Sequence, residues 1–253
     1  MQVKTLLVLL VAGFLTLAFS QTSISKLLFH DDFEKDKIGS EPSKWEMAHK
    51  GGGQKATVIK DPDNPKNQIM SSSSAPAGSA RHDAGGSIYV TGDPNWTDYV
   101  AEWDMMFPED YYMGVVFRFQ DAEAFYLSDR RGGGVQYNFY KRKAGNWSLI
   151  AGGQFQNKPM VWYRAQLTLR GSDFTFKIKE LKDTKPFNKI DPATKGSDGD
   201  FKKGRFGNYG LVYLDNIFIG DSEEDLVLPV SSGDKLSSTW GKIKSCQRIS
   251  ITD

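Results

Sequence analysis

The amino-acid sequence predicts an all-β fold in which two antiparallel sheets form a sandwich, followed by a linker and a short C-terminal helix. Between residues 27 and 220, short runs of alternating apolar and polar residues are separated by Gly, Pro, Asn and Asp. No long stretch in this region has the period of an α-helix. Many short strands joined by turns are typical of a two-sheet sandwich.

Alternation with a period of two locates the predicted strands. In residues 98–107, Tyr99 and Trp103 alternate with Glu102 and Asp104. One face of such a strand packs on a core, and the other meets solvent or a ligand. The predicted strands cover residues 28–33, 56–60, 86–91, 98–107, 113–120, 124–129, 135–141, 162–170, 173–180 and 209–219.

The N-terminus has the features of a secretory signal peptide. Lys4 precedes an apolar stretch over residues 5–17, and the small residues Ala18 and Ser20 form a small-x-small sequence that predicts cleavage after Ser20. We therefore expect a secreted protein, or a periplasmic one if the host is a Gram-negative bacterium. The predicted organisation is a signal peptide at 1–20, one sandwich domain at 21–220, and a linker and tail at 221–253.

Two polar segments interrupt the strands, and a third follows them. Residues 71–80 and 182–203 are predicted to be surface loops, because they are rich in Ser, Gly, Pro, Asp and Lys. After residue 220 the composition becomes that of a linker. Leu236, Trp240 and Ile243 then recur at the spacing of one helical face, which predicts a short amphipathic helix.

Composition excludes several classes of partner. Lys and Arg number 32 and Asp and Glu number 31, and the two are equal once the predicted signal peptide is removed. Nucleic acids and anionic membrane surfaces require a basic excess, so neither is predicted as the main partner. No later stretch is apolar enough to be a membrane span. The single cysteine, Cys246, permits no intrachain disulfide, and nothing in the sequence determines the oligomeric state.

The segment 112–131 resembles the central motif of the concanavalin A-like jelly rolls, which include laminin-G-like domains and L-type lectins. In that motif a G-x-x-F-R-x-x-D strand precedes a strand beginning with an aromatic pair. The matching residues are Gly114, Phe117, Arg118, Asp121, Phe125 and Tyr126. Residues 29–33, 162–171 and 204–217 resemble the opening strand, the W-Y hairpin and the closing D-N-I strand, in the expected order. The resemblance implies a jelly-roll sandwich over residues 27–220, in a superfamily of lectins, adhesion modules, glycosidases and lyases.

A sugar-binding face on such a sandwich combines aromatic rings with Arg, Asn and Asp side chains. Because Phe117 and Phe119 alternate with Arg118, we expect Arg118 to point to the more polar face of its strand. We expect a polysaccharide or glycoconjugate to bind residues that share one concave sheet: Arg118, Tyr126, Asp129, Gln136, Tyr137 and Tyr140.

The resemblance also implies a structural calcium ion. Related jelly rolls often hold Ca²⁺ where the first and last strands meet, and Ca²⁺ prefers carboxylate and carbonyl oxygens. Asp31 and Asp32 lie on the matching first strand and Asp215 lies on the last, so these are the candidate ligands. The alternative is that the aspartates cap turns or pair with Lys or Arg.

Catalytic residues are not predicted. Glu102 and Asp104 match the first two carboxylates of the E-x-D-x-x-E or E-x-D-x-E strand that laminarinase-like glycosidases of this fold share, but Met106 and Phe107 stand where the third should be. The sequence therefore favours a secreted, non-catalytic carbohydrate- or matrix-binding module. Two alternatives stay open: a glycan-active hydrolase or lyase on the same fold, and a structural adhesion component.

Overall fold

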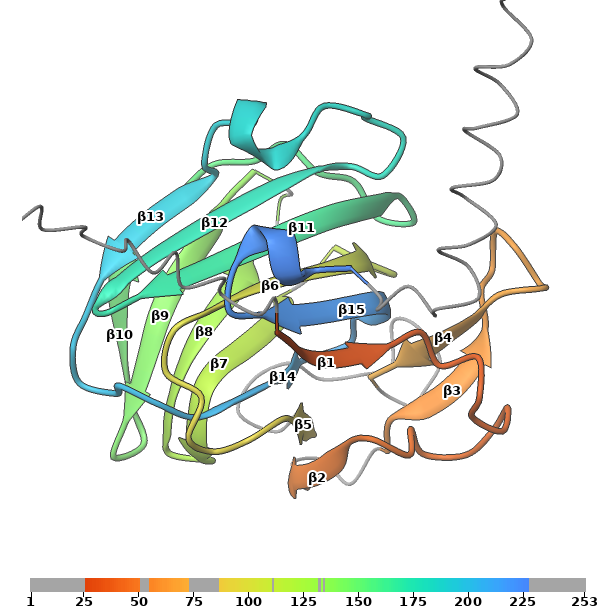
Figure 1. Cartoon of the computed structure of the whole chain (residues 1–253), viewed down its shortest axis with the longest axis horizontal. Coiled ribbons are helices and arrows are strands. Elements are labelled where there is room, and N and C mark those ends of the chain that lie inside the picture. Colours follow the sequence, from red (N-terminus) through yellow and green to blue (C-terminus); the bar gives the residue numbers. More distant parts are fainter. Residues whose placement is uncertain are drawn as a thin grey trace, which may run out of the picture.

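The computed structural model describes residues 26–50, 55–72, 87–110, 112–131, 133 and 135–227. Within these ranges the chain forms two antiparallel sheets that pack face to face, with sheet A in front of sheet B in Figure 1. The predicted all-β sandwich is confirmed. The signal peptide, the C-terminal helix and Cys246 lie outside the described residues. None of the described segments forms a helix long and apolar enough to span a membrane.

The first and last strands of the sandwich lie side by side in sheet A, with Asp31 opposite Ile217. In spatial order, sheet A contains β13 (Thr194–Ser197), β12 (Asp173–Glu180), β11 (Trp162–Arg170), β6 (Tyr99–Met106), β15 (Tyr213–Gly220), β4 (Gln68–Ser71) and β3 (Thr57–Lys60), and β1 (Leu27–Asp31) also pairs with β15. Sheet B contains β10 (Asn146–Ala151), β9 (Tyr137–Lys143), β8 (Ala124–Arg130), β7 (Met113–Asp121), β14 (Arg205–Tyr209), β5 (Ile88–Thr91) and β2 (Glu46–His49).

Several short strands are absent from the sequence prediction, namely β2, β4, β10, β13 and β14. The predicted strand 209–219 is wrong at its start, because a turn at Gly210, with a φ of 71°, separates β14 from β15. The surface loop predicted over 182–203 is also wrong in part. It contains a 3-10 turn (Phe187–Lys189) and β13, which is held by backbone pairing with β12. Hydrogen bonds between strand backbones do not depend on which side chains the strands carry. A strand held mainly by such bonds therefore need not show the alternation by which strands are predicted from sequence.

The main core lies between the sheets and is rich in aromatic rings. The Tyr137 ring on β9 stacks on the Phe176 ring of β12, with the ring centres 4.1 Å apart and the planes within 10° of parallel. Phe117 of β7 meets Phe174 of β12 edge to face at 5.0 Å. Each such pair contributes about 0.5–1.5 kcal/mol beyond the area it buries. These contacts join sheet A to sheet B along their length.

A second apolar cluster lies on the outer face of sheet B. Val116 and Leu127 are opposite each other in β7 and β8, whereas their neighbours Val115 and Tyr126 belong to the main core. Alternation therefore sends this second set away from sheet A. Its members are Ile88, Val90, Val116, Phe119, Phe125, Leu127 and Tyr209. Sheet B is thus apolar on both faces.

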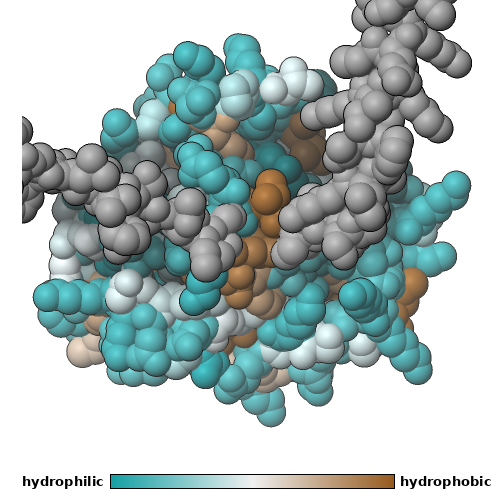
Figure 2. Space-filling model, in the orientation of Figure 1, coloured by the Kyte–Doolittle hydropathy of each residue, from teal (hydrophilic) through white to brown (hydrophobic). Residues whose placement is uncertain are grey.

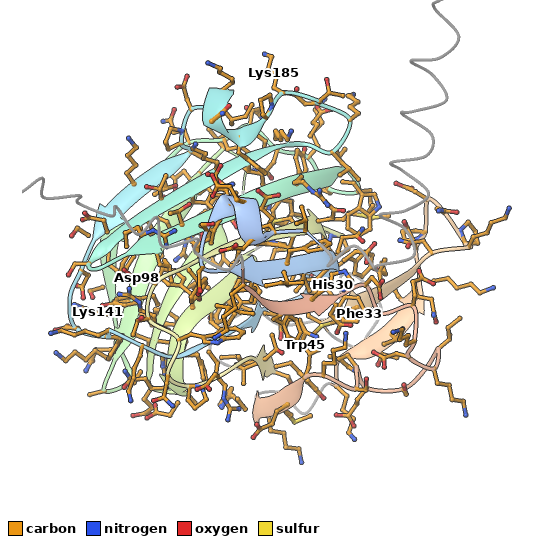
Figure 3. The ribbon with its side chains drawn as sticks, viewed as in Figure 1. His30, Phe33, Trp45, Asp98, Lys141 and Lys185 are labelled. Carbon is orange, nitrogen blue, oxygen red and sulfur yellow. The ribbon has the colours of Figure 1, made fainter. Side chains whose placement is uncertain are left out.

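The opposite side of the molecule is different in character. The face seen in Figure 2, over sheet A, is mostly hydrophilic, with a hydrophobic strip near its centre above β15 and β1 and smaller hydrophobic patches elsewhere. At the edge of this region Phe33 and Trp45 pack together with their ring centres 6.2 Å apart, beside β1 in Figure 3. An antiparallel sandwich commonly exposes one polar sheet face, so the apolar outer face of sheet B is the candidate for binding.

Candidate ligand-binding face

The six residues predicted to share one sheet face do not share it. Tyr126 and Tyr137 belong to the main core between the sheets, and both are fully buried. Tyr140 packs against the apolar cluster on the opposite, outer face of sheet B. Asp129 lies opposite Asn138, one position from the core-facing Tyr137, so alternation directs it outward as well. Gln136 is exposed and bridges to Gln154 just before β9.

Arg118 lies at a bulge in β7, which explains why the alternation prediction for it is wrong. Its φ is +45°, and the register between β7 and β8 shifts after Phe117. As a result Phe117 stays in the main core, Phe119 joins the outer cluster, and the Arg118 guanidinium stacks on Phe174 of the core at 5.5 Å. An extra residue in one strand turns the following side chains to the other face.

The buried Arg118 guanidinium is engaged by oxygen atoms of the protein. It donates to the carbonyl oxygen of Phe201 at 3.0 Å and to that of Gly171 at 2.7 Å. It also donates to the Thr97 carbonyl at 3.2 Å and pairs with the Asp98 carboxylate at 3.3 Å. Arg118 is only 1% exposed. These contacts tie β7 to three loops at the end of the sandwich where Asp98 is labelled in Figure 3.

Tyr126 has a similar anchoring position. Its hydroxyl donates to an Asp198 carboxylate oxygen at 2.6 Å and accepts from the Phe201 backbone N–H at 2.9 Å. The Lys141 ammonium pairs with Asp198 and with Asp200 beside it. The segment after β13 is therefore fastened to β8 and β9.

The aspartates predicted to bind calcium have protein partners. The Asp31 carboxylate pairs with the Lys44 ammonium at 3.0 Å and accepts from the Trp45 indole N–H at 3.0 Å. Asp32 accepts from the backbone N–H of Glu34 at 3.3 Å. The described ranges hold no group of three His, Cys, Asp or Glu side chains that could bind a metal ion. The calcium site stays a prediction from the sequence.

Asp215 is part of a buried polar network on the outer face of sheet A. It accepts from the Asn67 amide at 2.9 Å, and the Asn216 amide donates both to Asp215 and to Asp104 at 3.0 Å. Asn216 has a φ of +48°, at the point where the β15–β6 register shifts. Burial, reinforced by the nearby Asp104 charge, raises the pKa of Asp215 to about 7.

Glu102 and Asp104 are both engaged in pairs with β11. Asp104 accepts two hydrogen bonds from Arg164, at 2.7 and 3.1 Å, and Glu102 accepts from the Gln166 amide at 2.8 Å. Burial raises the pKa of Glu102 above its ordinary value. These pairs join neighbouring strands of sheet A, on the side away from the main core.

Two hollows open on the outer side of sheet B. The first, here called the Trp147 hollow, is open to solvent, and its lining includes His49, Glu123, Phe125, Arg142, Trp147 and Tyr209. The second is also open to solvent and is lined in part by Glu46, Phe119, Gln120 and Arg205. Trp147 is 39% exposed although its ring packs edge-on against Phe125 at 5.5 Å. The Trp147 hollow therefore combines an accessible aromatic ring with charged and polar groups.

Aromatic and arginine side chains lie next to one another on the outer side of sheet B, on β9 and β10, just after β8 and just before β7. The Arg142 guanidinium lies over the Trp147 ring at 5.2 Å, and the Arg131 guanidinium lies over the Tyr140 ring at 3.9 Å and the Tyr112 ring at 4.7 Å. Trp147 and Tyr140 meet edge to face at 6.4 Å. We call these five residues the aromatic–arginine stripe. Sequence reasoning found only Tyr140 among them, although the N-W-S segment at Trp147 and the Arg131 beside the motif were both visible.

Asp129 lies beside the stripe as a buried carboxylate. It is 1% exposed, its two oxygens accept no hydrogen bond, and the Arg131 Nε lies 3.3 Å from Oδ1. Burial raises the pKa of Asp129 to about 8, and the Arg131 charge opposes that rise only in part. Burial therefore disfavours the charged form of the carboxyl group that pairs with Arg131.

The sandwich has counterparts among solved structures. No family model matches the chain, and no curated protein matches its sequence. The carbohydrate-binding module CBM66 from Bacillus subtilis superposes with a TM-score of 0.50 at 15% sequence identity, over 70% of this chain and 95% of that one. The chain shares the fold of a carbohydrate-binding module.

Two further structures are similar to a lesser degree. A xylan β-1,4-xylosidase from Bacillus halodurans has a TM-score of 0.48 at 11% identity, over 76% of this chain and 38% of that one. Domain 4 of AbnA, an extracellular arabinanase from Geobacillus stearothermophilus solved in complex with arabinotriose, has a TM-score of 0.44 at 11% identity, over 77% and 92% of the two chains.

Proposed function

We propose that this chain is an exported, non-catalytic carbohydrate-binding module of the concanavalin A-like jelly-roll type. It binds a polysaccharide or glycoconjugate on the outer face of sheet B. The observation that carries the proposal is the Trp147 hollow, in which a 39% exposed indole ring lies beside Arg142 and Glu123. Aromatic faces pack against the CH-rich faces of sugars, and charged groups at the rim bind the hydroxyls.

The fold supports this proposal in a second way. Arg118 and Tyr126 are held by loop carbonyls and by Asp198, so the end of the sandwich beneath the face is rigid. Phe125 supports Trp147 from below, and Phe119 stacks on Phe125 at 5.5 Å. A ligand therefore meets a preformed platform, and little ordering is needed on binding.

The test is binding of a glycan panel to the purified protein and to Trp147→Ala. Removing the ring is expected to weaken binding by about tenfold to a hundredfold, the range of an aromatic anchor. The matched control is Trp162→Ala, which removes a partly buried tryptophan from the outer face of sheet A. Loss of binding in Trp162→Ala but not in Trp147→Ala would move the site to sheet A and overturn the proposal.

One observation favours a second candidate function, a glycan-cleaving enzyme. Glu123, His49 and Tyr209 line the same hollow, so that a carboxylate lies near an imidazole and a phenol. These residue types supply general acids and bases. Shortened sugars released by the unaltered protein, and not by Glu123→Gln, would support the enzyme. Intact glycans recovered after binding would support the module.

A further inference from the structure

We propose that the aromatic–arginine stripe binds an acidic glycan, one whose sugars carry carboxylate or sulfate groups. The inference rests on the proposed function, because it names the ligand class of the same face. Its basis is the state of the two half-buried guanidinium groups of Arg142 and Arg131, whose contacts differ from those of Arg118 and Arg164.

Arg142 has a charge with no carboxylate bound to it. Its Nε is buried and makes no hydrogen bond, and within the described ranges no acidic group forms an ion pair with it. Glu123 lines the same hollow without forming such a pair. By contrast, Arg164 makes two hydrogen bonds to Asp104, and Arg118 is surrounded by four oxygens. A half-buried guanidinium group that pairs with no carboxylate of the described residues is suited to a bidentate bond with a carboxylate or sulfate.

Arg131 is held in place by the rings of Tyr112 and Tyr140, with its guanidinium against both. Its Nε makes no hydrogen bond, and its one acidic neighbour is Asp129. The Asp129 carboxyl group is buried away from water, which disfavours its charged form. Arg131 therefore presents a guanidinium group held between two aromatic rings on the outer face of sheet B, with Asp129 as its ion-pair partner among the described residues.

The separation of the two arginines favours a polymer. Arg142 lies opposite Phe125 in the β8–β9 register, and Arg131 follows β8 six positions after Phe125. The spacing that a ligand meets is that of the guanidinium groups: Arg142 lies over the Trp147 ring at 5.2 Å, the Trp147 and Tyr140 rings are 6.4 Å apart, and Arg131 lies over Tyr140 at 3.9 Å. Ligand charges that repeat along a chain match this spacing, and the three rings between and beside the arginines offer stacking surface for the sugars.

The charge of the surroundings favours a glycan over a nucleic acid. The chain has 32 basic and 31 acidic residues, and Glu123 lies in the hollow with Arg142. Proteins bind the phosphate backbone of a nucleic acid with a surface that carries many Lys and Arg residues. An acidic glycan whose charges are widely spaced requires only a few Arg side chains, with uncharged side chains between them.

Calorimetric titration of the purified protein tests the inference with four kinds of oligomer: uronate sugars, sulfated sugars, neutral arabinan and xylan fragments, and single-stranded oligothymidylate. We expect an acidic glycan to bind at least about tenfold more tightly than the neutral ones at low salt, with that advantage reduced at about 0.5 M salt. The uronate and sulfate arms identify which anionic group is recognised.

The variants Arg142→Gln and Arg131→Gln are each expected to remove most of that tenfold preference while leaving weak neutral binding. Arg142→Lys keeps the positive charge and is expected to keep part of the preference for acidic glycans. A preference that is lost in Arg142→Gln but partly kept in Arg142→Lys reflects loss of the charge and not loss of the fold. The control is Arg170→Gln, an exposed arginine at the end of β11 that donates to the Asp221 carbonyl.

The outcomes separate the two proposals. Equal binding of acidic and neutral glycans, unaffected by salt and by both arginine variants, would overturn the acidic-glycan inference and leave the module standing. Preference for oligothymidylate over all glycans would also overturn it. Binding of none of the glycans would overturn the proposed function together with the inference.

Discussion

Asp104 and Arg164 form a two-point ion pair across neighbouring strands of sheet A, with Nε 2.7 Å from Oδ1 and Nη2 3.1 Å from Oδ2. The Asp104 side chain is 5% exposed and that of Arg164 is 32% exposed. The same Asp104 carboxylate accepts from the Asn216 amide. The pair therefore joins β6, β11 and β15, and it gives a structural role to a carboxylate that resembled part of a catalytic motif.

Arg164→Met is expected to lower the free energy of unfolding by about 3 kcal/mol, because it leaves the Asp104 charge buried without its partner. Urea unfolding at pH 7 measures the loss. The double variant Asp104→Asn/Arg164→Met is expected to recover part of it, since no buried charge then remains. If the double variant is no more stable than the single one, the ion pair does not explain the stability of this region.

Arg118→Met is expected to destabilise the protein by about 3 kcal/mol, because four oxygen atoms, among them the buried Phe201 carbonyl, lose their donor. Arg118→Lys is expected to recover little, since an ammonium group cannot reproduce the fork of contacts. Thermal unfolding gives the stability, and glycan binding at low temperature gives the affinity of the folded fraction. If folded Arg118→Met binds the glycan more weakly than the unaltered protein does, Arg118 contacts the ligand, as the sequence predicted.

Asp129 is expected to make stability depend on pH. Its pKa is raised in the folded protein from 3.8 to about 8, so the folded state favours the protonated form. The contribution of this group to stability is present below about pH 4 and is lost as the pH rises through about 8. Asp129→Asn is expected to match the unaltered protein at pH 4 and to be more stable by at least about 2 kcal/mol at pH 9.

Melting temperatures from pH 4 to pH 9 check this expectation, with Asp173→Asn as an exposed aspartate control. Arg131 is the charged group that faces Asp129. On the neighbouring strand, burial raises the pKa of the Tyr137 hydroxyl, and the nearby Asp129 charge raises it further. Parallel melting profiles for the unaltered protein and Asp129→Asn would contradict the raised pKa.

The calcium site predicted from Asp31, Asp32 and Asp215 has a direct test in the melting temperature with saturating Ca²⁺ and with a chelator. If the site exists, Ca²⁺ raises the melting temperature by several degrees, because it binds only the folded chain. Asp215→Asn then abolishes the rise. Ca²⁺ would have to displace Lys44 from Asp31, so Lys44→Met is expected to strengthen the effect. Identical melting curves with and without Ca²⁺ would show that the predicted calcium site is wrong.

The fold class and the position of most strands could be predicted from the sequence, because the alternation of side chains along a strand is a local property. Tyr99 and Trp103 of β6, for example, could be assigned to the core from their spacing, and both are fully buried. The short strands β2 and β13 could not be predicted in this way, because backbone pairing with β5 and β12 defines them.

Only the tertiary structure decided which side chains form the candidate binding face. The bulge at Arg118 reverses the alternation that the sequence implied, and four loop oxygens then enclose its guanidinium. Arg142 and Trp147 meet because β9 and β10 pair. Arg131 lies just after the end of β8, and its guanidinium contacts the rings of Tyr112 and Tyr140. Strand order, register shifts and burial depend on residues far apart in the chain, and a local pattern contains no record of them.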